Sequence, residues 1–195
     1  LIDSDALVVT KRSSEMVGLS SQAIDKVIKS NRERKIATQI VDADLLRQLS
    51  PDIILTQELC YVCAVEYGAV CDVTTEILDY EPQIVSLKPA GVDDILENII
   101  KIAEVCNVKG SGEKLVNSIR SRMNFVIDKL AQASDLKAPR TFCIDWLAPL
   151  RNTGQWIPEL IEMAGGREEL AEKNGKSREV SWEEVLKYDP DIIFS

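Results

Sequence analysis

The sequence predicts an α/β protein of two lobes, with mainly parallel sheets, joined by one long connecting helix. Short apolar runs alternate with helical patterns along the 195 residues. A helix, a proline turn and an isoleucine-rich run occur together twice, at residues 41–55 and 180–194. Between these copies lies a helical pattern of about 20 residues, which would span roughly 30 Å.

The repeated unit contains its own start and stop signals. Asp42 can cap the first short helix, and Ser181 with Glu184 forms a capping box at the second. Pro51 and Pro190 stand at matching positions and end each helix, and the apolar run that follows predicts a strand buried on both faces. Because solenoid repeats recur every 20 to 50 residues or so, two copies this far apart indicate two lobes of similar construction.

The remaining elements follow from the same signals. Further strands are expected at residues 6–10, 84–86 and 142–145, and further helices from Ser20 or Ser21, at 92–106, at 115–130 and from Trp156 to Gly165-Gly166. We therefore predict an N-terminal lobe at 1–108, a connecting helix at 109–137 and a C-terminal lobe at 138–195.

Composition excludes several classes of function. A formal net charge of -9 and the lack of a basic cluster argue against nucleic acid as a partner. The chain has no histidine, which removes Ser/His/Asp and Cys/His catalysis and histidine-ligated zinc. The paired carboxylates look like helix starts and solvated faces, so we predict no catalytic residues, no catalytic cofactor and no enzyme. No run is long and apolar enough to predict membrane insertion within this sequence.

The loops that follow strands are the candidate binding sites, because ligands of open parallel sheets lie beyond the carboxyl ends of the strands. One alternative for each loop is an ordinary turn, and for the tryptophans it is core packing. Two of only three tryptophans lie in the last loops, and their flat faces suit a large flat ligand. Trp182, directly after a helix cap, is expected to pack inside. The candidate contacts are Lys11, Arg12, Ser13, Gln57, Glu58, Leu59, Tyr61, Trp146, Leu147, Gly154, Gln155 and Trp156, with Ser86-Leu87-Lys88-Pro89 as a further loop.

The five cysteines cannot all pair within one chain, since their number is odd. Cys60 and Cys63 form a single CxxC motif, which is compatible with a redox or metal site, a loop disulfide or buried thiols. A tetrahedral metal site would need two more ligands from Cys71, Cys106 or Cys143, and we predict no metal.

Four stretches, in order, resemble the class III substrate-binding proteins of ABC importers for cobalamin, haem and ferric siderophores. They are residues 41–57, 59–65, 154–166 and 180–194, and the cysteine-bearing loop is most similar to that of cobalamin-binding-like members. The resemblance implies two α/β lobes joined by one long helix, a corrinoid ligand held in the cleft between them, and delivery to an ABC permease. It also implies an extracytoplasmic location, as a periplasmic protein or membrane-anchored lipoprotein, and docking carboxylates at Glu66 and Glu168.

The pattern departs from this family in two ways. Relatives often carry Gly-His-Trp where this chain has Gly154-Gln155-Trp156, which removes a possible axial ligand to cobalt or iron. In that family a strand and a helix normally precede the stretch matched by Leu7-Val8-Val9, and a helix follows the last strand. We therefore expect a truncated C-terminal lobe, with a minimal domain as the alternative. The alternatives are a ferric-siderophore or haem binder, a cytoplasmic corrinoid-binding or sensor module, and a cysteine-based redox or metal protein.

Overall fold

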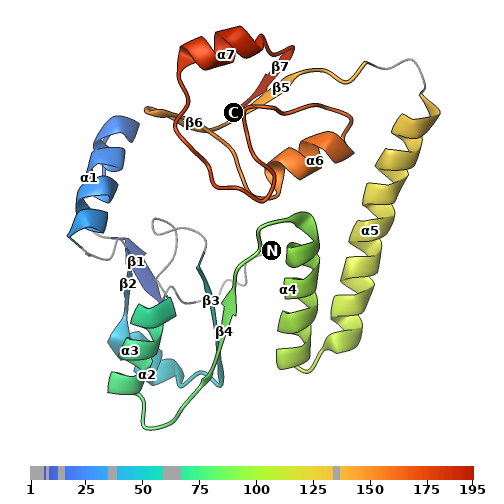
Figure 1. Cartoon of the computed structure of the whole chain (residues 1–195). Helices are drawn as coiled ribbons and strands as arrows, with labels where there is room; N and C mark the ends of the chain where they lie inside the picture. The colour runs from blue at the N-terminus through green and yellow to red at the C-terminus, as the bar shows by residue number, and fades with distance from the viewer. Residues whose placement is uncertain (1–6, 8, 13–15, 35–38, 59–66, 134–136) are drawn as a thin grey trace. The chain divides into compact units, whose positions relative to one another are not determined.

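The computed structural model describes the chain except for residues 1–6, 8, 13–15, 35–38, 59–66 and 134–136. It divides into two compact units, Leu1–Lys88 and Pro89–Ser195 (Figure 1). This division differs from the boundary expected after residue 108, because the helix at 92–105 packs within the second unit. The α/β class with parallel strand pairs is as the sequence predicts.

Unit 1 contains two described strand pairs. β1 (Thr10–Arg12) pairs antiparallel with β2 (Gln39–Val41), and β3 (Ile53–Gln57) pairs parallel with β4 (Gln83–Leu87). The helices are α1 (Ser21–Glu33), α2 (Ala43–Leu49) and α3 (Tyr67–Ile77). The first strand was expected at 6–10, but its pairing with residues 39–41 places Lys11 and Arg12 inside the strand rather than in the following loop.

Unit 2 begins with a helical hairpin, α4 (Val92–Val105) and α5 (Lys109–Gln132), whose helices lie side by side in Figure 1. Its sheet has the order β6-β5-β7, with β5 (Thr141–Leu147) antiparallel to β6 (Leu150–Asn152) and parallel to β7 (Ile192–Phe194). The helices α6 (Ile157–Met163) and α7 (Trp182–Tyr188) complete the unit. Its buried core is formed by Phe142, Leu150, Val180 and Val185, with Ile144 and Leu170 packed against it.

The predicted repeat is present in the structure. Asp42 accepts a hydrogen bond from the Leu45 backbone N–H at the start of α2, and Ser181 accepts one from that of Glu184 at the start of α7. Both helices end in a left-handed residue, Ser50 with φ 44° and Asp189 with φ 51°, before the proline. Each copy leads into a strand that has a parallel partner, β3 in unit 1 and β7 in unit 2.

The long helix is also present. α5 begins at Lys109, where the connecting helix was expected to begin, and ends at Gln132 rather than at residue 137. It includes Gly110-Ser111-Gly112, which precede the apolar pattern at 115–130. Gly112 is buried against α4, where an added Cβ would collide with the Ala103 side chain. The absence of a side chain at Gly112 therefore permits the close approach of the two helices.

We predict that Gly112→Ala destabilises the protein, because a methyl group at this contact must push α4 and α5 apart. The expected loss is about 1–3 kcal/mol, typical of overpacking. Gly110→Ala is the matched control, since nothing lies within 4 Å of an added Cβ there. Alanine at that helical position should be neutral or stabilising by up to about 1 kcal/mol. Urea unfolding of both variants checks this, and an unchanged Gly112→Ala would contradict the packing described.

Candidate functional site

A polar cluster lies at the carboxyl ends of β3 and β4 in unit 1. Gln57 pairs with Leu87 at the last register position, and the Glu58 backbone N–H donates to the Leu87 carbonyl (3.2 Å). The Glu58 carboxylate accepts a hydrogen bond from Ser86 Oγ (2.5 Å) and pairs with Lys88 Nζ (2.5 Å). We call Glu58, Ser86 and Lys88 the Glu58 cluster.

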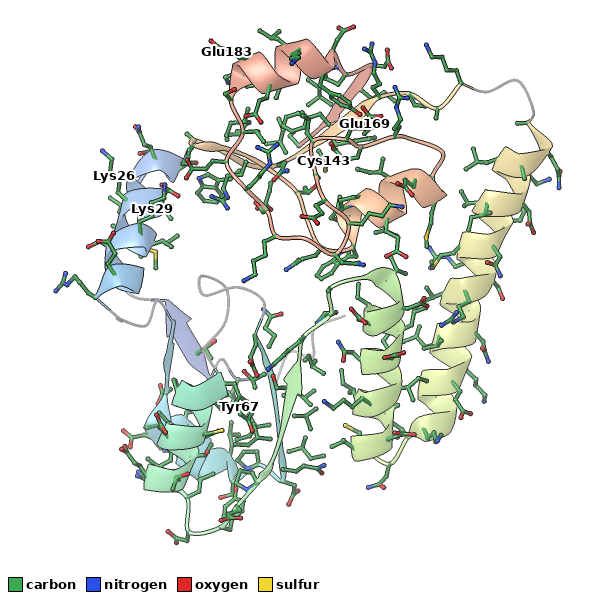
Figure 2. All side chains as sticks on the ribbon, in the orientation of Figure 1. Lys26, Lys29, Tyr67, Cys143, Glu169 and Glu183 are labelled. Carbon is green, nitrogen blue, oxygen red and sulfur yellow. The ribbon has the colours of Figure 1, made fainter. Side chains whose placement is uncertain are left out.

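The neighbours of Glu58 keep its carboxylate ionised. Hydrogen bonds from Lys88 and then from Ser86 lower the pKa of Glu58 below its ordinary value. Tyr67, at the start of α3 (Figure 2), also responds to these charges. A hydrogen bond with Cys71 is the largest cause that raises the pKa of Tyr67, and the charge of Glu58 adds to it while that of Lys88 opposes it. Tyr67 and Cys71, one helical turn apart, were not among the predicted contacts.

In unit 2, the predicted tryptophans lie outside the buried core. Trp146, near the end of β5, is half-buried and its Nε1 donates to the Ala148 carbonyl (2.9 Å), while Leu147 beside it is 65% exposed. Trp156 is the half-buried N-cap residue of α6. The expectation for Trp182 was wrong: its side chain is 54% exposed on the first turn of α7, since Val185 is the residue of that helix that enters the core.

The Gly154–Trp156 loop is held against residues 174–177 by backbone contacts. The Gln155 backbone N–H donates to the Gly175 carbonyl (2.6 Å), and the Asn174 N–H donates to the Gln155 carbonyl (3.0 Å). An added Cβ on Gly154 would lie 2.6 Å from the Ser177 nitrogen, so only glycine fits. Gln155 has φ 57°, a left-handed conformation that an L residue adopts only when its surroundings enforce it.

The helix that follows this loop, α6, is bonded to the start of α4. Glu159, in the first turn of α6, accepts a hydrogen bond from the Val92 backbone N–H (2.8 Å). Asp94 accepts from the Ala90 and Gly91 N–H groups, and these bonds lower the pKa of Asp94. Gly91 also leaves room for Asn174, whose Oδ1 would lie 2.6 Å from an added Cβ. Sequence reasoning missed Glu159, because a carboxylate in the first turn of a helix looks like ordinary dipole stabilisation.

Glu168, expected to supply a docking carboxylate, is instead engaged inside unit 2. Its side chain is only 8% exposed, and its oxygens accept hydrogen bonds from the backbone N–H groups of Cys143 (3.1 Å) and Leu170 (2.8 Å). Burial raises the pKa of Glu168, although these N–H groups oppose the rise. In this position the carboxylate joins β5 to the 168–170 segment and is not presented at the surface; the neighbouring Glu169 is exposed (Figure 2).

The other predicted contacts are placed as follows. Gln57 and Glu58 lie together in unit 1, and Gly154, Gln155 and Trp156 lie in one loop of unit 2. Trp146 and Leu147 were expected in the loop after the strand at 142–145, but they are the last residues of β5, because this strand continues through its antiparallel pairing with β6. Lys11 and Arg12 lie in β1. Ser13, Leu59, Tyr61, Glu66 and the Cys60–Cys63 motif fall outside the described residues.

The cysteine and acidic side chains of the described residues are dispersed. These residues include no group of three or more histidine, cysteine or acidic side chains that could hold a metal ion. Cys71, Cys106 and Cys143 are free thiols, and burial raises the pKa of Cys143, shown in Figure 2, which disfavours its reactive thiolate. Within the same described residues, every helix is too short or too polar to span a bilayer.

We predict that Glu168→Ala destabilises the protein by about 2 kcal/mol, because it removes the buried carboxylate that accepts from the part-buried Cys143 and Leu170 N–H groups. The measurement is urea unfolding followed by circular dichroism. Glu169→Ala, which removes an exposed carboxylate paired with Arg167 (3.1 Å), is the control and should cost less than about 1 kcal/mol. Equal effects of the two substitutions would contradict the structural role of Glu168.

The raised pKa of Glu168 also predicts a pH dependence. The folded state holds the proton of Glu168 more tightly than the unfolded state, so this group contributes most stability below its ordinary pKa of 4.5. That contribution is lost as pH rises through the higher folded-state pKa. The stability of the wild type relative to Glu168→Gln should therefore fall as the pH rises above the ordinary pKa of 4.5. A difference that grows with pH would show instead that the folded state favours the ionised form.

Comparison with known proteins adds three findings. The whole chain, residues 1–195, matches the family described as periplasmic binding protein. No curated protein matches the sequence. Several solved structures share the fold, although sequence identity to each is below 20%.

Three of these structures illustrate the similarity. An ABC transporter substrate-binding protein from Listeria monocytogenes EGD-e is 17% identical with a TM-score of 0.59, and the match covers 78% of this chain and 56% of that one. The periplasmic vitamin B12 binding protein BtuF of Vibrio cholerae is 19% identical with a TM-score of 0.57, and the match covers 79% of this chain and 57% of that one. A periplasmic heme binding protein from Pseudomonas aeruginosa is 18% identical with a TM-score of 0.59, and the match covers 79% of this chain and 54% of that one. The chain thus spans little more than half the length of these proteins.

Proposed function

Because the chain belongs to the periplasmic binding protein family, we propose that it captures a large cofactor-like ligand, specifically a corrinoid, for delivery to an ABC importer. The binding is non-catalytic. The permease partner and a location outside the cytoplasm belong to the same proposal. The overall acidity of the chain, with a net charge of -9, suits docking onto a basic permease surface, and Glu66 is the proposed docking residue from the first unit.

The observation that carries the proposal is the position of Trp146 and Trp156. Both are half-buried and neither belongs to the core of unit 2, although large aromatic side chains gain most by full burial. Exposed Leu147 extends the apolar surface beside Trp146. Aromatic and aliphatic surface with a few fixed polar groups is the usual composition of a site for a large flat ligand.

The backbone of Gln155 is held by two hydrogen bonds, one from its N–H to the Gly175 carbonyl and one from the Asn174 N–H to its carbonyl. The Cα position of Gln155, and so the origin of its amide side chain next to Trp156 in the chain, is therefore fixed. An amide can donate to and accept from the amide groups at the rim of a corrinoid. Glutamine in place of a histidine offers hydrogen bonds to that rim rather than a ligand to the metal.

Unit 1 contributes contacts at the ends of its strands in this proposal. Gln57 offers an amide at the carboxyl end of β3, next to the Glu58 cluster. The remaining proposed contacts of this unit are Lys11, Arg12, Ser13, Leu59 and Tyr61.

Haem is the second candidate ligand, because structures with this fold include a periplasmic heme binding protein as well as a vitamin B12 binding protein. The two ligands differ at their rims: haem carries propionate groups, whereas cobalamin carries amides. A binding experiment with both separates the candidates.

The test is a titration of the full chain with cyanocobalamin and, separately, with hemin and a ferric siderophore, followed by tryptophan fluorescence. A Trp182→Phe background removes the exposed tryptophan of α7, so the signal reports on Trp146 and Trp156. N-acetyltryptophanamide corrects for light absorbed by the ligand. Saturable quenching by cyanocobalamin is expected; saturation by hemin or the siderophore alone would assign the ligand to the alternative, and saturation by none would refute the function.

We predict that Trp156→Ala weakens binding by at least about 1 kcal/mol, roughly fivefold, since the variant loses an aromatic face against the ligand. Equilibrium dialysis measures the affinity without relying on fluorescence. Trp182→Ala is the matched control and should leave the affinity unchanged. If Trp156→Ala alters stability but not affinity, this residue is a packing residue of α6 and not a ligand contact.

A further inference from the structure

The Glu58 carboxylate uses both of its oxygens within unit 1. One oxygen accepts from Ser86 Oγ and the other pairs with Lys88 Nζ, each at 2.5 Å. The two charged side chains differ in access to solvent: that of Lys88 is 62% exposed and that of Glu58 is 25% exposed. A ligand at this edge of β3 and β4 could therefore reach the lysine, but it would meet a positive charge that is already compensated.

The pairing of β3 with β4 does not require the Glu58 carboxylate. The Glu58 backbone N–H donates to the Leu87 carbonyl and continues the β3–β4 ladder by one residue, whatever side chain position 58 carries. An exposed ion pair of this kind contributes little to stability. The main physical effect of Glu58 is thus on the local charge, and that charge is felt by a third residue, since both Glu58 and Lys88 act electrostatically on Tyr67.

Charge at this position matters for a ligand with ionised groups. One unpaired charge on the protein, about 7 Å from a carboxylate of the ligand, changes the affinity for that ligand by roughly threefold in water. The change is larger where the protein lowers the dielectric constant. The Lys88 ammonium and the Glu58 carboxylate, 2.5 Å apart, form a dipole, whose field falls off faster than that of a single charge. The carboxyl ends of β3 and β4 therefore present little net charge to an approaching ligand.

On the basis of the proposed function, we propose that the Glu58–Lys88 ion pair sets the charge preference of the binding site. By compensating Lys88, Glu58 makes this edge of unit 1 favour a ligand whose rim carries neutral amides over one whose rim carries carboxylates. Glu58 and Lys88 are thus specificity-determining residues that act as a pair.

The test compares four forms of the full chain: wild type, Glu58→Gln, Lys88→Gln and the double variant. Equilibrium dialysis measures the dissociation constants of cyanocobalamin, with its amide-bearing rim, and of monomeric hemin, with its propionates. Glu58→Gln exposes the charge of Lys88 and should shift the preference toward hemin by about threefold to tenfold. Lys88→Gln leaves a lone carboxylate and should shift it in the opposite direction, while the double variant returns to within about twofold of wild type.

Two controls separate charge from structure. Glu104→Gln removes the same formal charge from an ion pair with Lys109 (2.7 Å) at the turn between α4 and α5, and it should leave the preference unchanged. High salt should shrink the shift caused by Glu58→Gln, because screening acts on an electrostatic effect and not on a packing change. Circular dichroism confirms that each variant is folded.

Each outcome decides the proposal. Opposite shifts in the two single variants, reduced by salt, support it. Equal preferences in all four forms, or shifts of the two single variants in the same direction, overturn it while leaving the proposed function intact. If wild type binds neither ligand, the proposed function fails and this inference fails with it.

Discussion

The hydrogen bond from the Val92 backbone N–H to the Glu159 carboxylate joins parts of unit 2 that lie far apart in the sequence. It ties the start of α4 to the first turn of α6, and Gly91 admits Asn174 beside the same carboxylate. The loop with Gly154 and Gln155 packs on residues 174–177, and its Gln155 carbonyl accepts from the backbone N–H of the same Asn174. The start of α4, whose N–H groups lack partners within the helix, thus contacts both α6 and the segment on which the loop with Trp156 packs.

The two candidate regions obtain their rigidity in different ways. In unit 2, backbone hydrogen bonds and glycine contacts hold Gln155 in a left-handed conformation. The backbone of Gln155 in turn sets where the next residue, Trp156, begins. In unit 1, the parallel ladder of β3 and β4 carries the Glu58 cluster, whose side chains are held by charge and hydrogen bonds. The first arrangement presents a mostly apolar surface, and the second presents a polar surface whose charges compensate one another.

Several features could be predicted from the sequence because their causes are local. Asp42 and Ser181 cap helices that prolines end, and these signals lie within a few residues of one another. Trp146 and Trp156 could be chosen because tryptophan is rare in this chain. Lys11 and Arg12 were assigned to a loop, however, because the partner that extends β1 to Arg12 comes from residues 39–41, and strand pairing leaves no local signal.

The sequence by itself determined the α/β class, the repeated helix-proline-strand unit, the long helix and the family, since each rests on periodicity, capping or ordered motifs. Only the tertiary structure decided what individual carboxylates do. Glu58, Glu159 and Glu168 are chemically identical, yet one compensates a lysine, one binds the start of another helix, and one is buried and accepts from the backbone of β5. The physical reason is that the role of a charged side chain depends on its solvation and on partners that are distant in sequence.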